Sequence, residues 1–172
     1  MNEKHRIFLE HFEPLKHSLW RFCLSVTKSY EDAKDLLQET IENAYLSFDS
    51  LKNKQAFLSW LFTIASRKNV ERLKKSKLYD TSVDFENILA IAESNIGNPE
   101  LQTDIKFLYE ELEKLPYQQK EAVILSEIIG LTHKEIAEIQ STTTEAVKQK
   151  IYRAKITLKS NLSFISYDFL VN

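Results

Sequence analysis

The stretch Leu131–Lys155, LTHKEIAEIQSTTTEAVKQKIYRAK, predicts two short helices joined by a tight turn. Gly130 stands just before it, in the position that favours the end of a preceding helix. Thr132 and Glu135 then have the spacing of a capping box, in which each side chain accepts a hydrogen bond from the backbone amide of the other residue. We therefore expect the first short helix to begin at Thr132.

The second helix of the stretch is expected to begin at Thr142 or Thr143, because Thr142 and Glu145 repeat the capping-box spacing and leave the choice of cap open. Ser141 and Thr142 supply the turn before it. Apolar residues then recur about one turn apart and predict a stripe that points inward: Val147, Ile151, Ala154 and Leu158.

The opposite face of this second helix is polar. At about 100° per residue, it carries Glu145, Gln149, Tyr152 and Ile156, flanked by Lys148 and Arg153. Outward amide, ammonium and guanidinium groups can donate hydrogen bonds to base edges in the DNA major groove, and a short preceding helix completes a helix-turn-helix arrangement. The alternative interpretation is a surface helix with ordinary solvated basic residues.

Basic charge is gathered into two segments, although the 172-residue chain has a formal net charge of −2. Residues 67–77 hold six basic residues against one acid, and residues 144–160 hold five against one. Between them, residues 80–113 hold nine acids against one lysine. Such asymmetry indicates nucleic-acid contact at the basic patches, whereas solvated helix faces are the alternative explanation.

Composition favours an all-α protein. Hydrophobic residues make up 43% of the chain, and only two glycines and three prolines occur, too few for many tight hairpins. Cys23 is the only cysteine, so an intramolecular disulfide is impossible and no Cys-rich zinc site is expected. No segment approaches about 18 consecutive apolar residues, and the charged N-terminus is unlike a signal peptide. We expect a cytoplasmic protein without membrane insertion.

The N-terminal part of the chain predicts further helices. Residues 5–28 predict one or two helices broken near Pro14, and Ser29 is expected to cap a long amphipathic helix. Residues 49–55 are polar and predict a loop, after which AFLSWLFTIASRKNVERLKKSK predicts a helix that is first apolar and then basic.

The domain organisation follows from these elements and from a stretch without helical periodicity. We expect two small helical domains, residues 1–77 and 103–172, joined by a flexible acidic linker over residues 78–102. Periodicity returns at Thr103, and Pro116 is expected near the first position of the next helix.

Three blocks of the sequence resemble the bacterial sigma-70 family. YEDAKDLLQETIENAYLSFDSL and FLSWLFTIASRKNVERLKK resemble region 2, and LPYQQKEAVILSEIIGLTHKEIAEIQSTTTEAVKQKIYRAKITLK resembles region 4. The blocks follow the order of the extracytoplasmic-function group and cover most of the chain. The resemblance implies a sigma factor that binds core RNA polymerase, recognises the promoter minus-10 and minus-35 elements and promotes transcription initiation.

The resemblance also implies roles for particular residues. Contacts to the polymerase β′ clamp coiled coil are expected at Asp35, Gln38 and Glu39. Contacts to the minus-10 element and to melted DNA are expected at Lys52, Asn53, Lys54, Arg67, Lys68 and Arg72. Contacts to the minus-35 element are expected at Thr144, Lys148, Gln149, Tyr152 and Arg153, in a domain that docks on the β flap. Phe57 and Trp60 could form a platform for a flipped base, but core packing is favoured for both.

The helix-turn-helix departs from the family pattern at three positions. Ser141 stands where a small turn residue, often glycine, is usual, and Gln140 stands where a hydrophobic residue is usual. Glu145 replaces a small residue near the start of the second helix and would repel phosphate there. These departures leave the promoter sequence and the strength of minus-35 binding open.

No motif of an enzyme is found, since HExxH, GxxxxGK and a nucleophile elbow are all missing from the sequence, so neither catalytic residues nor a cofactor or metal are expected. One alternative function is a stand-alone helix-turn-helix regulator that does not bind polymerase. Another is a sigma-like protein that mainly binds an anti-sigma factor, which is also an expected partner of a sigma factor in this group.

Overall fold

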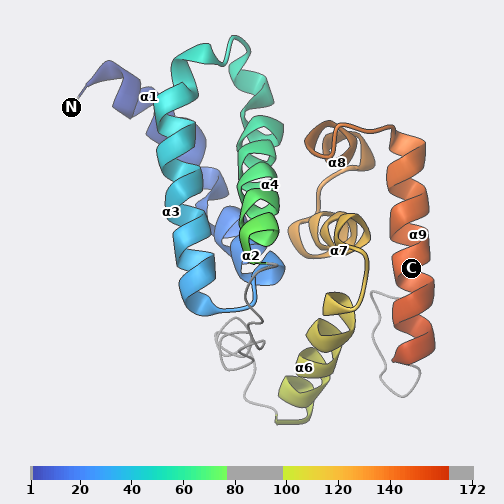
Figure 1. Cartoon of the computed structure of the whole chain (residues 1–172). Helices are drawn as coiled ribbons and strands as arrows, with labels where there is room; N and C mark the ends of the chain where they lie inside the picture. Colours follow the sequence, from blue (N-terminus) through green and yellow to red (C-terminus); the bar gives the residue numbers. More distant parts are fainter. Residues whose placement is uncertain (1, 77–98, 163–172) are drawn as a thin grey trace.

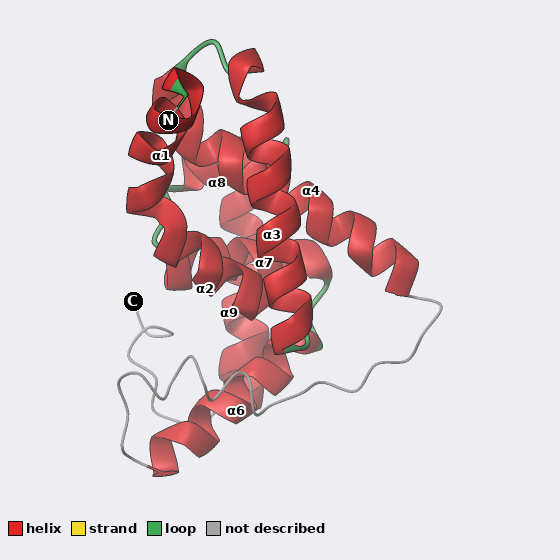
Figure 2. Cartoon of the chain, turned by 90° about the vertical axis from the view of Figure 1, so that its left-hand side faces the viewer, coloured by secondary structure: helices red, strands yellow, loops and turns green. Residues whose placement is uncertain are grey.

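The computed structural model of the protein describes residues 2–76 and 99–162, with the backbone alone for residues 99–103. Within these ranges the regular elements are helices, which confirms the all-α prediction (Figure 2). Residues 78–98 of the expected linker, and residues 163–172 at the C-terminus, lie outside the described residues.

The N-terminal residues form two helices separated by a short 3-10 turn: α1 (Glu3–Phe12), η1 (Glu13–Leu15) and α2 (Lys16–Val26). Pro14 lies within the turn, where its missing backbone N–H breaks the α-helical hydrogen-bond pattern. The predicted break near Pro14 is therefore confirmed.

The long amphipathic helix α3 (Tyr30–Ser47) is capped as predicted, because the Ser29 hydroxyl accepts a hydrogen bond from the Asp32 backbone N at 3.1 Å. The polar loop after it contains two 3-10 turns, followed by the next long helix: η2 (Phe48–Ser50), η3 (Lys54–Ala56) and α4 (Phe57–Ser76). Phe57, Leu61, Phe62 and Ala65 are buried, in agreement with the apolar first half expected for this helix.

Residues 99–162 of the C-terminal half form four α-helices and a π-helical segment: α6 (Pro99–Glu113), α7 (Tyr117–Val123), η4 (Ile124–Ile129), α8 (His133–Ile139) and α9 (Thr144–Asn161). Helix α6 begins four residues before the expected Thr103, because Pro99 is tolerated at the first position of a helix, where its missing N–H would have no partner. Pro116 is the N-cap of α7 rather than its first residue.

The helix-turn-helix forms where the sequence predicts it. Gly130 ends η4 in a left-handed conformation, with φ of 82°. Thr132 and Glu135 form both hydrogen bonds of the capping box at the start of α8. Helix α9 then packs against α7 and α8, which is the arrangement that presents the second helix of such a motif to DNA.

The two halves lie side by side, with α1–α4 in one and α6–α9 in the other (Figure 1). They share a hydrophobic core: Phe22 and Phe62 of the first half belong to the same buried cluster as Ile124, Leu125 and Ile136 of the second. Helix α4 packs on α8, and α2 packs on η4. The sequence predicts two helical units but not this common core.

Candidate nucleic-acid and polymerase interfaces

Helix α9 turns one face to the core and the opposite face to solvent. Its apolar stripe is buried as predicted: Val147, Ile151, Ala154 and Leu158. The predicted outer residues are exposed: Lys148, Gln149, Tyr152 and Arg153. Tyr152 is 67% exposed to solvent. Thr144 is half-buried at the first position of the helix. One side of α9 therefore gathers hydrogen-bond donors that match the acceptors of guanine and adenine in the major groove.

The start of α9 resolves the choice between the two candidate caps. Thr143 is the N-cap, since its hydroxyl accepts a hydrogen bond from the Ala146 backbone N at 3.1 Å. The predicted box at Thr142 is wrong, because Glu145 is then one position too early in the helix. The Glu145 carboxylate instead lies 3.2 Å from Lys148 Nζ, and both side chains are exposed. This pair offsets part of the repulsion that Glu145 would exert on DNA phosphate.

The two unusual turn residues have different consequences. Ser141 has φ of 50°, a left-handed conformation that costs a non-glycine residue about 1–2 kcal/mol, so glycine would be the unstrained choice there. Gln140 uses its polar side chain fully: Nε2 donates to Glu121 Oε2 at 2.9 Å and to the Gln118 carbonyl at 3.1 Å, and Oε1 accepts from Lys150 Nζ at 3.0 Å. A glutamine at position 140, in place of the usual hydrophobic residue, thus bonds to residues of α7 and α9.

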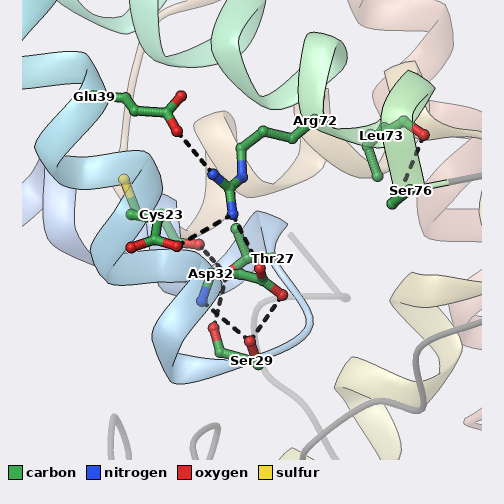
Figure 3. A network of polar contacts seen from close by, with 9 residues as sticks. Cys23, Thr27, Ser29, Asp32, Glu39, Arg72, Leu73 and Ser76 are labelled. Atoms are coloured by element: carbon green, nitrogen blue, oxygen red, sulfur yellow. Dashed lines mark hydrogen bonds and ion pairs between the residues drawn. The ribbon is translucent and has the colours of Figure 1, made fainter. Parts of the chain in front are cut away.

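The acidic face of α3 is held by an arginine from α4. Arg72 Nη1 donates to Glu39 Oε1 at 3.0 Å, and Nη2 donates to Asp32 Oδ1 at 2.9 Å (Figure 3). Asp35 is further away, with its Oδ2 atom 3.9 Å from Nη2, and both Asp35 and Gln38 are exposed. The side chain of Arg72 is 24% exposed, and its planar fork spans two carboxylates of a neighbouring helix.

The loop residues expected to contact melted DNA differ in their surroundings. Lys52 and Asn53 are exposed, and the Asn53 side chain accepts a hydrogen bond from the Gln55 backbone N at 3.0 Å. Lys54 is half-buried: its Nζ donates to the Phe48 carbonyl at 3.0 Å and lies 3.6 Å from the centre of the Phe48 ring. Lys54 therefore has a role in holding the loop.

The remaining basic residues on α4 lie far from this loop. Arg67 is exposed, and Lys68 Nζ lies 3.3 Å from Glu71 Oε2. Between Phe57 at the start of α4 and Arg67 the helix rises by about 15 Å, at about 1.5 Å per residue, so the structure does not bring the loop group and the helix group together. Phe57 is buried and Trp60 is half-buried against the same core, which agrees with the preferred core assignment.

A buried polar cluster that the sequence did not predict joins α4 to the second half. The Ser66 hydroxyl donates to Glu121 Oε1 at 2.5 Å, and Asn69 Nδ2 donates to the Tyr117 hydroxyl oxygen at 3.2 Å. Tyr117 in turn donates to Glu121 Oε1 at 2.8 Å, while Gln140 donates to the other carboxylate oxygen. Glu121 is only 2% exposed, so these donors replace the water that an ionised carboxylate requires.

The cluster perturbs the ionisable groups around it. Burial and the charge of Glu121 raise the pKa of Tyr117 well above its usual range. Burial lowers the pKa of Lys150, and the charge of Glu121 opposes that shift. The sequence held one signal of the cluster: Ser66 and Asn69 are polar residues three apart, as are neighbours on one helix face, and they lie in a segment that begins as a buried helix.

Two kinds of site receive no support from the residues that the structure describes. Across residues 2–76 and 99–162, no helix combines the length and the apolar character that crossing a membrane requires. In the same ranges, no group of three or more His, Cys, Asp or Glu side chains is arranged to hold a metal ion.

Comparison with known protein families gives two matches that together span both halves. Residues 11–78 match the sigma-70 region 2 family, and residues 108–158 match the sigma-70 region 4 family. The RNA polymerase sigma factor SigV of Bacillus subtilis is 32% identical over 148 residues, covering 86% of each chain. The ECF RNA polymerase sigma-E factor of Salmonella typhimurium is 32% identical over 136 residues, covering 72% of this chain and 70% of its own.

Solved structures share the fold. The sigma factor RpoE from Bartonella quintana, in complex with the anti-sigma factor NepR, superimposes with a TM-score of 0.70 at 22% identity and covers 92% of this chain and 98% of its own. CnrH, in complex with the cytosolic domain of CnrY, gives a TM-score of 0.70 at 21% identity and covers 94% and 91%.

Proposed function

The chain belongs to the extracytoplasmic-function group of the sigma-70 family of RNA polymerase sigma factors. From this premise we propose that two of its surfaces bind different partners. The chain is thus a DNA-binding factor for promoter recognition at transcription initiation. The outer face of α9 reads the minus-35 element, and the outer face of α3 binds core polymerase. The observation that carries this proposal is the exposure of Lys148, Gln149, Tyr152 and Arg153 on one side of α9.

The chemistry of the α9 face suits base reading at a small number of positions. Gln149 can pair with adenine, and Lys148 or Arg153 can donate to guanine. Tyr152 can contact the thymine methyl group or a sugar-phosphate. Thr144, at the first turn, can donate its hydroxyl to a phosphate near the positive end of the helix.

The acidic face of α3 suits a basic partner. Asp35 and Gln38 are exposed acceptors, and Glu39 is oriented by Arg72. We assign Arg72 the role of a positioning residue for polymerase binding, because the carboxylates of Asp32 and Glu39 occupy its guanidinium in place of DNA phosphate.

Contacts to the minus-10 element are assigned to the three exposed residues of the expected set, Lys52, Asn53 and Arg67, and to the half-buried Lys68. Lys52 and Asn53 would hold single-stranded DNA at one end of α4, and Arg67 and Lys68 would contact duplex phosphates further along the helix. Lys54 supports the loop through Phe48. Residues 1–77 would then form the minus-10 and polymerase domain, and residues 103–172 the minus-35 domain.

An anti-sigma factor is proposed as a regulatory partner. The Bartonella quintana RpoE structure above is a complex with an anti-sigma factor, and the CnrH structure is a complex with the cytosolic domain of CnrY. A chain that works with RNA polymerase and promoter DNA would act in the cytoplasm. A stand-alone regulator is the weaker candidate, because it gives no function to the polar outer face of α3.

The test mixes the full chain with core RNA polymerase, follows co-elution on gel filtration, and maps transcription start sites on genomic DNA. We expect co-elution and a defined set of start sites. Asp35→Ala should reduce co-elution and leave duplex binding intact, since Asp35 is exposed on α3 and far in sequence from α9.

The matched control for that variant is Glu31→Ala, which removes an exposed carboxylate from the first turn of the same helix. If the Asp35 variant co-elutes as well as the Glu31 variant, the polymerase role of this face is wrong. If the unchanged chain neither co-elutes nor directs start sites where a control sigma factor does, the whole proposal is wrong.

A further inference from the structure

Lys150 differs from the basic residues on the outer face of α9. Lys148 and Arg153 are exposed on the proposed minus-35 face, whereas Lys150 is half-buried. Its Nζ donates to Gln140 Oε1 at 3.0 Å. At about 100° per residue, the side chain of Lys150 leaves the helix about 200° away from that of Lys148. The structure therefore directs this cation toward neighbouring helices and away from the face that is proposed to read bases.

Gln140, the C-cap residue of α8, joins α7 to α9 through its side-chain amide. Its Nε2 donates to Glu121 Oε2 at 2.9 Å and to the Gln118 carbonyl oxygen at 3.1 Å, both on α7. Its Oε1 accepts from Lys150 on α9. We call the contacts among Glu121, Gln140 and Lys150 the Gln140 link. All three residues lie in the second half of the chain, on the helices that form and support the helix-turn-helix (Figure 1).

The charges on either side of the Gln140 amide allow it one orientation. In the reversed orientation its N–H groups would face the Lys150 ammonium and its oxygen would face the Glu121 carboxylate, and both contacts would be repulsive. Glu121 is buried, so its carboxylate needs such donors in place of water. Hydrogen bonds to a charged partner are also stronger than those between neutral groups. The Gln140 link is therefore a directional contact between α7 and α9.

A directional contact matters because the other packing of α9 on these helices is mainly apolar. Val147 and Ile151 are buried, and the free energy of apolar burial has no preferred direction. A rotation of α9 by about 10° moves a side-chain atom about 6 Å from the helix axis by about 1 Å. Such a displacement is enough to break a hydrogen bond to a base edge. A contact that fixes the rotation of α9 thus affects base reading at Gln149, the residue next to Lys150.

The turn before α9 also needs contacts that hold it. Ser141 has φ of 50°, a left-handed conformation that residues other than glycine rarely adopt. Such a conformation persists where the surrounding structure fixes it. On one side, the Thr142 backbone N donates to the Ala137 carbonyl at 2.9 Å. On the other side, the Gln140 side chain is bound to α7, so the link holds the turn from which α9 starts.

We propose that Gln140 and Lys150 are positioning residues, which fix the rotation of α9 and thereby determine how well its outer face distinguishes the minus-35 element from other DNA. This inference rests on the proposed minus-35 role of that face. The Gln140 amide is bonded to protein groups on both sides, and the Lys150 ammonium is bonded to Gln140. Both residues therefore act through Gln149 and its exposed neighbours and not through contacts of their own with DNA.

Two substitutions remove the link from its two ends. Gln140→Leu replaces the amide by an apolar group of similar size, and Lys150→Met removes the ammonium but keeps a long side chain. Mobility shifts of the full chain compare a short duplex that holds the minus-35 element of a mapped promoter with the same duplex after that element is scrambled. Each variant should lower the ratio of the two affinities about tenfold, as for one weakened base contact, while binding to the scrambled duplex does not fall.

The salt dependence of binding distinguishes positioning from direct contact with phosphate. Each phosphate that a protein cation neutralises contributes about 0.9 to the slope of log K against log salt concentration. Lys150→Met should leave this slope unchanged on both duplexes, because the unchanged chain holds the Lys150 ammonium on Gln140. A slope reduced by about 0.9, with equal losses of affinity on both duplexes, would identify Lys150 as a phosphate contact and overturn the inference.

The double variant tests whether the two residues act as one unit. Gln140→Leu combined with Lys150→Met should lower the affinity ratio about as much as either change alone, because each change already breaks the link. Losses that add in full would contradict the link. If circular dichroism shows that Gln140→Leu has lost helix, Lys150→Met carries the test, since Lys150 is only half-buried.

Two control variants make matched changes outside the link. Gln118→Leu removes an exposed side-chain amide from α7 but keeps the carbonyl that accepts from Gln140. Lys159→Met removes an exposed lysine from the last turn of α9. Both should keep the affinity ratio of the unchanged chain. A loss of the ratio in these controls as large as in the link variants would show that the effect is not specific to Gln140 and Lys150.

NMR of the protein without DNA tests the link itself. The side-chain amide hydrogens of Gln140 should exchange with water at least about tenfold more slowly than those of the exposed Gln149, because both are bonded within the fold. Equal exchange rates would mean that the link does not form in solution, and the inference would be wrong.

The duplex measurements also separate the inference from the proposed function. If the unchanged chain prefers the minus-35 duplex and both single variants keep that preference within about twofold, the positioning role is wrong and the role of α9 stands. If the unchanged chain does not distinguish the two duplexes, minus-35 reading by α9 is wrong, and the positioning role is overturned with it.

Discussion

The second half of α4 and the outer face of α9 carry similar basic residues but present them differently. On α9, Lys148 and Arg153 are exposed, and Lys148 has an exposed ion pair with Glu145. On α4, Arg72 is 24% exposed and donates to two carboxylates of α3. A run of basic residues therefore identifies a positively charged helix, but the acidic residues of the neighbouring helix determine which of these charges remain available to DNA.

The reason lies in what packs beside each helix. Helix α4 lies along α3, whose Asp32 and Glu39 come within hydrogen-bond distance of Arg72. The neighbours of α9 are α6, α7 and α8, which cover its apolar stripe. Two lysines at the edge of that stripe are bound by neighbouring elements: Lys150 donates to Gln140 at the end of α8, and Lys155 lies 2.8 Å from Glu127 of η4.

The largest effect is expected from the α9 face. Lys148→Ala should weaken binding of the full chain to promoter duplex by about 1–3 kcal/mol if Lys148 donates to a base. Electrophoretic mobility shifts on promoter and on random duplex would measure it. Lys159→Ala, an exposed lysine near the end of the same helix, is the control. An equal loss on both duplexes would mark Lys148 as a phosphate contact.

A smaller effect is expected from the α4 clamp. Arg72→Ala leaves Asp32 and Glu39 without their shared donor, so it should lower the free energy of unfolding by about 1 kcal/mol and reduce co-elution with core polymerase. Arg72→Lys should fall in between, because a single ammonium cannot span both carboxylates. Urea unfolding and gel filtration measure the two quantities. A loss of duplex binding at unchanged stability would instead make Arg72 a DNA contact.

The smallest effects on DNA binding are expected when a single lysine loses its ion-pair partner. Glu145→Ala removes the ion pair on Lys148, and Glu71→Ala removes that on Lys68. Each pair lies at the surface and is worth only a few tenths of a kcal/mol, so a gain of at most about twofold in DNA binding is expected. A gain confined to minus-35 duplex for the first variant and to minus-10 DNA for the second would assign each lysine to its element; no gain in either would contradict both assignments.

Local sequence was sufficient to predict the helices and the division of α9 into a buried and an exposed face. The caps at Ser29 and Thr132, the break at Pro14 and the end of η4 at Gly130 depend on residues within one turn of each other. The division of α9 into a buried and an exposed face likewise follows from a period of about 3.6 residues. Family resemblance then identified the sigma factor blocks that the comparisons confirm.

Sequence was insufficient where partners come from distant segments. Arg72 and Asp32 are 40 positions apart, and Ser66 and Glu121 are 55 positions apart. The sequence of a helix does not show whether its serine or glutamate side chain faces water or bonds to another helix.

By itself, then, the sequence determined that this chain forms helices with defined ends and a helix-turn-helix whose second helix has a polar outer face. It also determined that the chain is a sigma factor. Only the tertiary structure decided that Arg72 holds an acidic face, that Gln140 has a buried partner, and that the two halves close on a shared core. The physical reason is range: caps and periodicity act over a few residues, whereas burial and ion pairing depend on which helices the folded chain brings together.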